Sequence, residues 1–392
     1  MIRSALVPDT RRVRLCMKDL YQQDLVEMIE RETRNFQVWS IGFPSHPDFA
    51  EAYELLWNEF GPHGGMERIE AVKSFLLEDP YEPTPAGGYM RYFLLVAKDA
   101  EGRLLGARDG VLLLNQSYDP DLLVVFLSHI VMKPEARGTV LSYWLRIAPV
   151  ELAVQYLADL QSMGKIKVPA PDQPARYFGM QIDLAAEMEY FAPDDPISLQ
   201  RILFYGRGGF DAINPRYFPY RQPDFRDPEL IRTTGNQPVP FMMLLRRLGR
   251  ERQAAIPTEE ARAVMRLLYD DFATHCSPEN LQDSLDAVLA RLGTRESRGS
   301  IELLPLPTGA RDLHRLRPLF RYTAFTRYYP GEPDTLAWLK SGVAEKVKAN
   351  PRYLDDELTR IAEELESRPR YVYQSREKDP EWTPKTASWR RR

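Results

Sequence analysis

The sequence predicts an α/β (α+β) fold in which helices flank a mixed sheet and a mainly helical region follows at the C-terminal end. Three observations predict it: apolar runs that alternate like strands, longer segments with apolar residues at helical spacing, and a change after Gly249 to helical segments alone. At 392 residues with 44% hydrophobic residues, the chain is longer than a typical domain and can bury a large core.

The first half of the chain predicts helices before a set of strands. Helical spacing and proline or glycine boundaries predict helices over 18–33, 47–60 and 66–79, with a strand over 36–43. Three strand-like runs follow over 89–99, 103–115 and 121–132. The segment KDAEGR predicts a hairpin turn between the first two. The third run is apolar on both faces, so we expect it at the centre of the sheet.

The second half predicts further alternation and then helices. A long helix is expected over 141–161, where Pro149 predicts a kink or a break. A strand lies within 176–190, a helix ended by glycines over 196–210, and a late strand over 239–248. Beyond Gly249, four helices are expected over 257–275, 277–293, 335–350 and 354–367.

These patterns divide the chain into four parts. We expect an N-terminal extension over 1–35, a main domain over 36–250, a helical C-terminal domain over 251–370 and a polar tail over 371–392. The sequence contains no internal repeat.

Composition excludes several classes of function. A formal net charge of −4 gives no field that attracts nucleic acid or an anionic membrane, so both partners are disfavoured. The two cysteines, Cys16 and Cys276, are far apart and predict neither a disulfide framework nor a metal site. No apolar run has the length of a signal-peptide core or a membrane span, so a soluble, cytoplasmic protein is expected.

The stretch HIVMKPEARGTVLSYWL, residues 129–145, passes from an apolar strand through Pro134 into a predicted helix. Backbone N–H groups at a helix N-terminus, together with the helix dipole, make an anion site. This stretch resembles the cofactor motif of the GNAT acyltransferases. The residues in register with that motif are Met132, Pro134, Arg137, Gly138, Leu141 and Ser142, while Val140 replaces its central glycine. Valine fits there only if residue 140 has helical dihedrals.

A second set of residues further along the chain strengthens the resemblance. A strand with a glutamate, a helix ending in an aromatic pair before a glycine, and a Tyr-x-Gln-Pro segment occur in the family's order. The matching residues are Glu187, Phe204, Tyr205, Gly209, Phe210, Tyr220, Gln222 and Pro223. The resemblance covers about residues 36–248, and its specific signal lies in 129–145 and 187–223.

The resemblance implies a GNAT-like, mostly antiparallel twisted sheet and direct transfer of an acyl group from acyl-CoA, with acetyl-CoA expected, to an amine. It implies Tyr205 as the acid that protonates the leaving thiolate and Glu187 as the base, with Ser128 orienting a water. The implied cofactor contacts are Ile130, Val131, Met132, Arg137, Gly138, Thr139, Val140, Leu141, Ser142 and Tyr143. No metal is implied.

Alternatives stay open for several of these residues. Glu187 is equally consistent with a solvated carboxylate at a strand end. His129 has the opposite strand parity to Phe126 and Ser128, which predicts a histidine packed under a helix.

The acceptor side is expected at the glycine-rich link around His63 and Glu67, although ordinary turn residues explain that link as well. The segment RYTAFTRYY, residues 321–329, is read as an aromatic docking patch rather than a nucleic-acid site. A second hypothesis, favoured by Val140, is a GNAT-like binding or regulatory protein that acts through its C-terminal helices. The sequence does not name the acceptor, and it leaves a homodimer open.

Overall fold

A ten-stranded sheet runs through the computed structural model, which describes residues 23–32, 35–63, 65–137, 139–167, 180–191, 196–226, 228–294, 299–319 and 349–367. Its order is β1-β2-β3-β4-β6-β10-β7-β12-β11, and β5 pairs with β3 beside β4. The strands are β1 (Gln37–Ile41), β2 (Tyr89–Lys98), β3 (Leu104–Leu114), β4 (Leu122–Phe126), β5 (Ile130–Met132), β6 (Gln181–Met188), β7 (Asp211–Ile213), β10 (Met242–Arg247), β11 (Ala255–Pro257) and β12 (Ser300–Pro305). A separate pair is formed by β8 (Arg221–Gln222) and β9 (Val239–Pro240).

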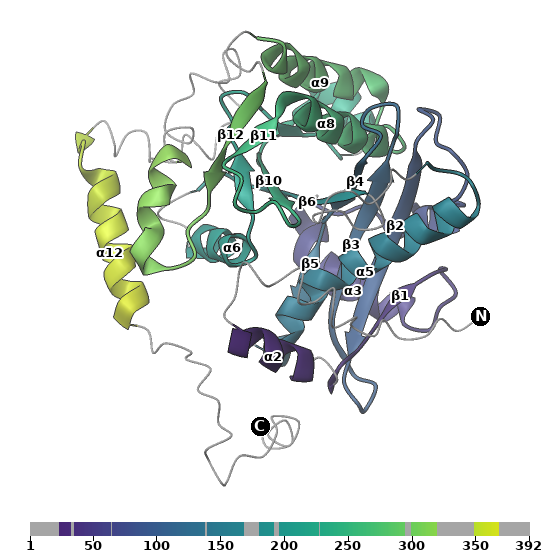
Figure 1. Ribbon diagram of the computed structural model, residues 1–392, viewed down its shortest axis with the longest axis horizontal. Helices are drawn as coiled ribbons and strands as arrows, with labels where there is room; N and C mark the ends of the chain where they lie inside the picture. The colour runs from purple at the N-terminus through teal and green to yellow at the C-terminus, as the bar shows by residue number, and fades with distance from the viewer. Residues whose placement is uncertain are drawn as a thin grey trace.

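All pairings in the large sheet are antiparallel except that of β4 with β6. The predicted mixed, mostly antiparallel sheet with flanking helices is therefore confirmed (Figure 1). The helices are α2 (Gln23–Glu32), α3 (Phe49–Phe60), η2 (Gly61–His63), α4 (Ile69–Leu77), η3 (Pro134–Ala136), α5 (Leu141–Ser162), α6 (Pro196–Arg207), α7 (Pro228–Thr234), α8 (Thr258–Phe272), α9 (Pro278–Leu292), η5 (Ala310–Arg315) and α12 (Tyr353–Ser367).

Helices cover both faces of the sheet. On β4, Leu123 and Val125 pack in the cluster that contains α5, while Val124 and Phe126 pack in the cluster that contains α8. We call these the α5 face and the α8 face. Helices α3 and α4 cover the part of the α8 face over β1 to β3. Every residue of β4 is buried, and β4 lies between β3 and β6 inside the sheet, where the sequence predicted it.

The predicted strand over 121–132 is wrong in one respect, because it is two strands. The segment 127–129 interrupts it, and β4 and β5 pair with different parts of β3. Strand β4 runs parallel to β6 from Leu122 to Phe126, and the Leu127 amide still bonds to the Ala185 carbonyl at 2.8 Å. Beyond that point β5 pairs only with β3, so it separates from β6.

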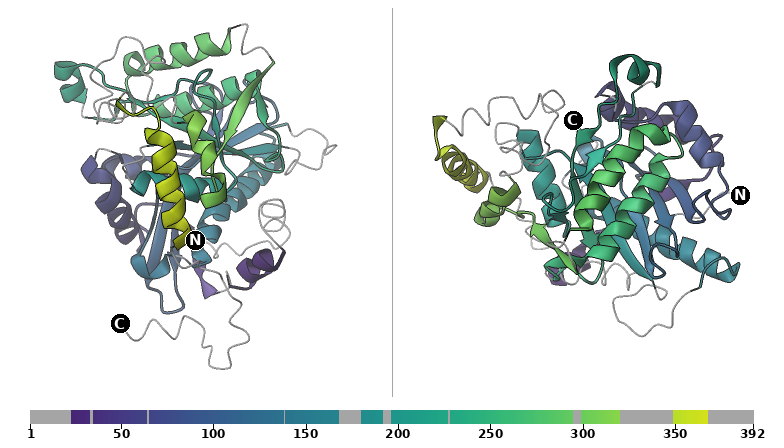
Figure 2. Two further views of the ribbon diagram at one scale, coloured as in Figure 1. Left: turned by 90° about the vertical axis from the view of Figure 1, so that its left-hand side faces the viewer. Right: turned by 90° about the horizontal axis from the view of Figure 1, so that it is seen from above.

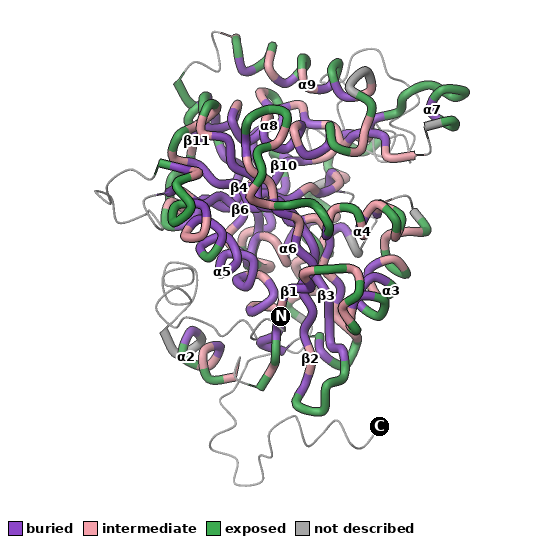
Figure 3. The backbone as a smooth tube through the Cα atoms, turned by 90° about the vertical axis from the view of Figure 1, so that its right-hand side faces the viewer, coloured by how far each residue is buried: buried purple, intermediate pink, exposed green. Residues whose placement is uncertain are grey.

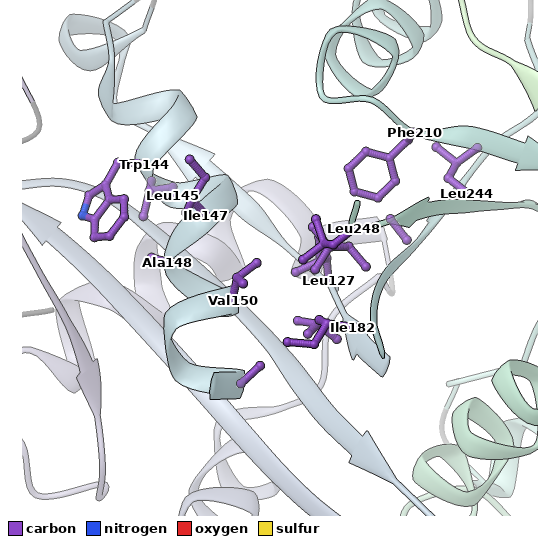
Figure 4. Close-up of a cluster of buried hydrophobic side chains, with 14 of the residues drawn as sticks. Leu127, Trp144, Leu145, Ile147, Ala148, Val150, Ile182, Phe210, Leu244 and Leu248 are labelled. Atoms are coloured by element: carbon purple, nitrogen blue, oxygen red, sulfur yellow. The ribbon is translucent and has the colours of Figure 1, made fainter. Parts of the chain in front are cut away.

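Helix α5 supplies more of the described core on its face than any other element does. Trp144, Leu145, Ile147 and Val150 project from it toward residues of the central strands, as Figure 4 shows. The helix is buried along most of its length, in contrast to α9 and α7 (Figure 3).

The helix α5 continues through Pro149, so the expected break is absent. Proline has no N–H to donate to the Leu145 carbonyl, and the Arg108 Nη1 atom donates to that oxygen instead, at 3.3 Å. A side chain from β3 therefore replaces the missing backbone donor.

Residues after Gly249 extend the same sheet. Strand β12 pairs with β7, β11 pairs with β12, and α8 packs on the buried residues of β3 and β4. The boundary near residue 250 stays a prediction, but strand pairing crosses it. Helix α12 lies beside η5, as the two views of Figure 2 agree, with Arg317 and Asp355 2.7 Å apart.

Three earlier expectations lie outside the described residues: most of the helix over 335–350, the aromatic segment 321–329 and the tail over 371–392. No helix among the described segments is long and apolar enough to cross a membrane.

Candidate active site

A pocket opens on the α8 face where β5 separates from β6. Its empty volume is about 730 Å³, the open space at its mouth included. Ser128 and Glu187, two of the three predicted catalytic residues, both line it. Glu67, from the link expected on the acceptor side, lines it as well. The end of helix α8 closes it with Asp271 and Phe272, together with Thr274 and His275 just beyond the helix.

One wall of the pocket is an ion pair between neighbouring strands. Asp109 on β3 accepts from the His129 Nδ1 atom at 2.9 Å, from the His129 amide at 2.9 Å and from the Tyr92 hydroxyl at 3.0 Å. The His129 Nε2 atom donates to the Gly65 carbonyl at 2.5 Å. Burial alone would lower the pKa of His129, but the charge and hydrogen bond of Asp109 outweigh it and raise the pKa to about 9. His129 is therefore an imidazolium at neutral pH and no base.

His129 is buried against Phe60 of helix α3, as expected of a packed histidine, but the expectation that it points away from Ser128 is wrong. It lines the same pocket as Ser128 and Glu187. Strand alternation holds only inside a continuous strand, and the chain leaves the regular pleat at 127–129. Its ring lies 4.7 Å from that of Phe60, between centroids.

Glu187 is the group whose protonation suits a base near neutral pH. It lies on β6 opposite Met243 of β10, and it accepts a hydrogen bond from the Tyr220 hydroxyl. Burial raises its pKa to about 7, against the opposing effect of hydrogen bonds from Tyr220 and Gln222 and of the charge of His129. The reading of Glu187 as a solvated surface carboxylate does not fit these surroundings.

Tyr205 lies on α6 and packs against the core of the α5 face, so the described pocket does not include it. Its ring meets Phe204 at 5.4 Å and Phe210 at 5.3 Å, edge to face. Burial raises the pKa of Tyr205, and the nearby charge of Arg108 opposes that rise. The phenol therefore keeps its proton at neutral pH, as a proton donor must. Gly209, with φ of 77°, lets the chain turn after α6 into β7.

The predicted phosphate cradle has a conformation that accommodates valine. Val140 has φ −63° and ψ −16°, so the helical condition on that residue is met. Its amide has no hydrogen-bond acceptor among the described residues.

Neighbouring amides of the cradle are already engaged within the turn. Arg137 donates to Pro134, Thr139 to Ala136, and Leu141 to the Thr139 hydroxyl at 3.3 Å. Gly138, a further residue of the predicted cradle, lies outside the described residues.

The predicted pantetheine edge is β5. Ile130, Val131 and Met132 pair with β3 on one side, and no described strand pairs with the other side. The Arg137 Nε atom donates to the Met132 carbonyl at 3.1 Å, which ties the start of the cradle to this edge. An extended ligand can add to such an edge through main-chain hydrogen bonds.

The sequence reading missed several pocket residues. Asp109 and Tyr92 lie on strands whose apolar pattern gave no sign of a site, and Asp271 and His275 belong to a region with no resemblance to assign them. His63 was expected on the acceptor side, and its side chain lies outside the described residues. No group of residues suited to a metal occurs within the described part of the chain.

Comparison with known proteins gives matches only among solved structures. No protein-family model matches the chain, and no curated protein matches its sequence. The spermidine N-acetyltransferase of Vibrio cholerae, solved with CoA and spermine, matches with 12% identity over 56% of this chain and 98% of its own, at a TM-score of 0.29. A Bacillus subtilis acetyltransferase solved with CoA matches with 14% identity over 54% of this chain and 99% of its own, at 0.26.

Both of these structures belong to the class that the sequence resemblance names. At such identities and TM-scores the matches carry no argument about substrate or activity. The fold class rests on the strand order and pairing of the chain itself.

Proposed function

We propose that the protein is an acyl-CoA-dependent N-acyltransferase, with acetyl-CoA as the expected donor, that acts by direct transfer to an amine. The observation that carries this proposal is the separation of β5 from β6, with Glu187 on the pocket wall at that point and the free edge of β5 beside it. A base with a pKa of about 7 at this place suits removal of a proton from an amine.

The proposed reaction has a place for each proton. The amine reaches the pocket as an ammonium ion and must lose a proton before its nitrogen can attack. Glu187 accepts that proton directly or through a water held by Ser128. The nitrogen then bonds to the thioester carbonyl carbon, the carbon–sulfur bond breaks, and Tyr205 gives its proton to the departing thiolate. The amide nitrogen loses its second proton to water, and Tyr205 regains a proton from water.

The donor is proposed to bind along β5 and the following turn. Main-chain groups of Ile130, Val131 and Met132 are the partners for the pantetheine amides. The N-terminus of α5, including the Val140 amide, is the partner for the pyrophosphate. Calorimetry with acetyl-CoA tests this: Gly138→Asp places a carboxylate at the cradle and is expected to weaken binding at least about tenfold. Equal affinities would remove the assignment.

A thiol-release assay over a panel of amines tests turnover once acetyl-CoA binding is measured. Tyr205→Phe and Glu187→Gln are each expected to lower kcat about a hundredfold while acetyl-CoA affinity is kept. Tyr217→Phe, at a partly exposed tyrosine outside the pocket, is the matched control and is expected to be unchanged. Turnover that survives both active-site substitutions would contradict the proposed roles.

A further inference from the structure

The pocket on the α8 face is strongly acidic. Five carboxylates line it, from Glu67, Glu78, Asp109, Glu187 and Asp271, and no lysine or arginine of the described residues does. Asp109 is neutralised by the imidazolium of His129, which it contacts at 2.9 Å. The remaining four carboxylates have no cationic side chain within the pocket lining.

Asp271 is the least expected of these groups. Only 7% of its surface is exposed, at the end of α8, yet its carboxylate makes no hydrogen bond or ion pair with any described residue. A buried carboxylate without a partner costs several kcal/mol, roughly, unless a ligand provides one. Its pKa is raised by burial and by the charges of Glu67, Glu78 and Glu187, so it faces the same space as those groups.

The walls between the carboxylates are aromatic. The His275 ring stacks on Phe225 at 5.5 Å and lies 5.4 Å from Phe75 and 6.3 Å from Phe272, between centroids. The His275 Nε2 atom lies 3.8 Å from Glu67. Aromatic faces accept methylene groups by apolar contact and ammonium groups by cation–π attraction.

We propose that the acceptor is a small amine that carries a second positive charge, a diamine or polyamine, whose remote ammonium group binds Asp271 while its reacting amine lies at Glu187. This proposal rests on the proposed acyltransferase function and names its substrate class. Glu67 and Glu78 contribute negative charge at the same end, and the rings of Phe75, Phe225 and Phe272 contact the methylene chain. The carboxylates that line the pocket support this assignment.

The test compares cadaverine with pentylamine, which differ only by one terminal amino group, as acceptors with acetyl-CoA. The wild-type protein is expected to show a kcat/KM at least about tenfold higher for cadaverine, the worth of one charge-assisted hydrogen bond. In Asp271→Asn the preference is expected to disappear through a higher KM for cadaverine. Glu259→Gln, an exposed carboxylate on the first turn of α8, is the matched control and is expected to keep the preference.

Two results would overturn the inference. One is an equal kcat/KM for the two amines in the wild-type protein. The other is an Asp271→Asn variant with an undiminished preference for cadaverine. Glu67→Gln is a second variant in case Asp271→Asn does not fold, and it is expected to reduce the same preference, because the charge of Glu67 acts on Asp271.

Binding without turnover separates this inference from the proposed function. If neither amine is acylated, calorimetry with cadaverine alone still tests the pocket. Cadaverine binding that falls at least about tenfold in Asp271→Asn supports the dication site while the transfer function fails. Cadaverine that binds no better than pentylamine overturns the site whether or not acyl transfer is found.

Discussion

Glu187 combines burial with two neutral hydrogen-bond donors. Burial alone would keep the carboxyl group protonated at neutral pH, and the donors Tyr220 and Gln222 oppose that effect. The resulting pKa of about 7 places the side chain where it can both take and release a proton in the physiological range. The tyrosine of the Tyr-x-Gln-Pro segment therefore lowers the proton affinity of Glu187, which burial raises.

The first prediction concerns the pH dependence of acyl transfer. In the wild-type protein, kcat/KM should fall below about pH 7, because Glu187 must be ionised to act as a base. Tyr220→Phe removes a hydrogen bond that stabilises the ionised form of Glu187. The acidic limb of the pH profile, where kcat/KM falls, should therefore move to higher pH. A pH profile of kcat/KM with a fixed amine measures both.

Glu187→Gln is the control, and it should abolish the limb along with most of the activity. An unmoved limb in Tyr220→Phe would contradict the role given to its hydroxyl. The effect of Glu187 on the free energy of unfolding depends on pH in the opposite direction to its effect on activity. The folded pKa of Glu187 lies above its usual value of 4.5, so the stabilisation it provides is present below pH 4.5 and is lost as the pH rises through about 7.

At the scale of residues, the sequence identified some members of the site and not others. Glu187, Tyr220 and Gln222 were found because they occur in a family order within a short stretch. Asp109 and Asp271 could not be found, because their meaning depends on which distant strand or helix ends lie beside them. From the sequence alone, it is not possible to predict whether a carboxylate within an apolar run contacts a histidine or lines a pocket.

Helix α5 shows how one element depends on a side chain from another. Pro149 leaves the Leu145 carbonyl without its helical donor, and Arg108 of β3 provides one at 3.3 Å. Burial lowers the pKa of Arg108 to about 10, so the guanidinium stays charged, although its Nε atom has no partner among the described residues. The sequence predicted a kink or a break at Pro149, but the helix continues, because the compensation from residue 108 cannot be predicted from helical spacing.

The second prediction is a thermodynamic coupling between residues 108 and 149. Arg108→Met should lower the free energy of unfolding by about 1–3 kcal/mol, because the buried Leu145 carbonyl loses its donor. In a Pro149→Ala background the alanine amide supplies that donor, so the same substitution should be neutral or stabilising, since it also removes a buried charge. Urea unfolding of the four proteins measures the coupling.

Additive effects at these two positions would contradict this account of the helix. Arg91→Met offers a comparison, because Arg91 is also buried and on a strand, and it contacts the ring of Tyr156 further along α5 at 5.8 Å. Its effect on stability should be independent of residue 149.

The strands show the same division between what pattern predicts and what it does not. The run over 121–132 is apolar on both faces, and this correctly placed β4 in the middle of the sheet. Hydrophobicity did not locate the interruption at 127–129, because Phe126 and Ile130 continue the apolar run on either side of it and Leu127 within it is apolar too. The interruption lies where the pairing with β6 ends: β4 pairs with β6, and β5 does not.

At the scale of the whole molecule, the region after Gly249 is tied to the rest by strands and by buried charge. Arg250 lies 2.6 Å from Asp183 on β6 and 2.9 Å from Glu260 on α8, and Arg247 of β10 lies 2.8 Å from Glu260. The sequence predicted helices after residue 257 but neither this network nor β11 and β12. Short strands that complete a sheet have too few residues for a periodic signal.

The third prediction follows from this continuity. A chain that ends at Leu248 loses α8 and β12, one of the two strands that pair with β7, and so exposes apolar residues of β3 and β4 that are now buried. It should lack a single cooperative thermal transition, because a buried face and a sheet edge are left uncovered. Calorimetry or circular dichroism against temperature measures this.

The polar composition of 371–392 predicts that a chain ending at residue 370 keeps the transition of the full chain. A cooperative transition in the chain that ends at Leu248, at the temperature of the full chain, would show that residues 36–248 form an independent domain after all.

The placement of Asp271 and His275 on the pocket wall has a consequence for the order in which the protein is made. The N-terminal part of a chain leaves the ribosome first, so the residues of the cradle and Glu187 emerge before the segment that closes the pocket. Until α8 has been synthesised and has docked, the nascent chain has the base without the remote carboxylate. On the proposed function, the residues for selectivity toward a doubly charged acceptor would be added last, when α8 docks.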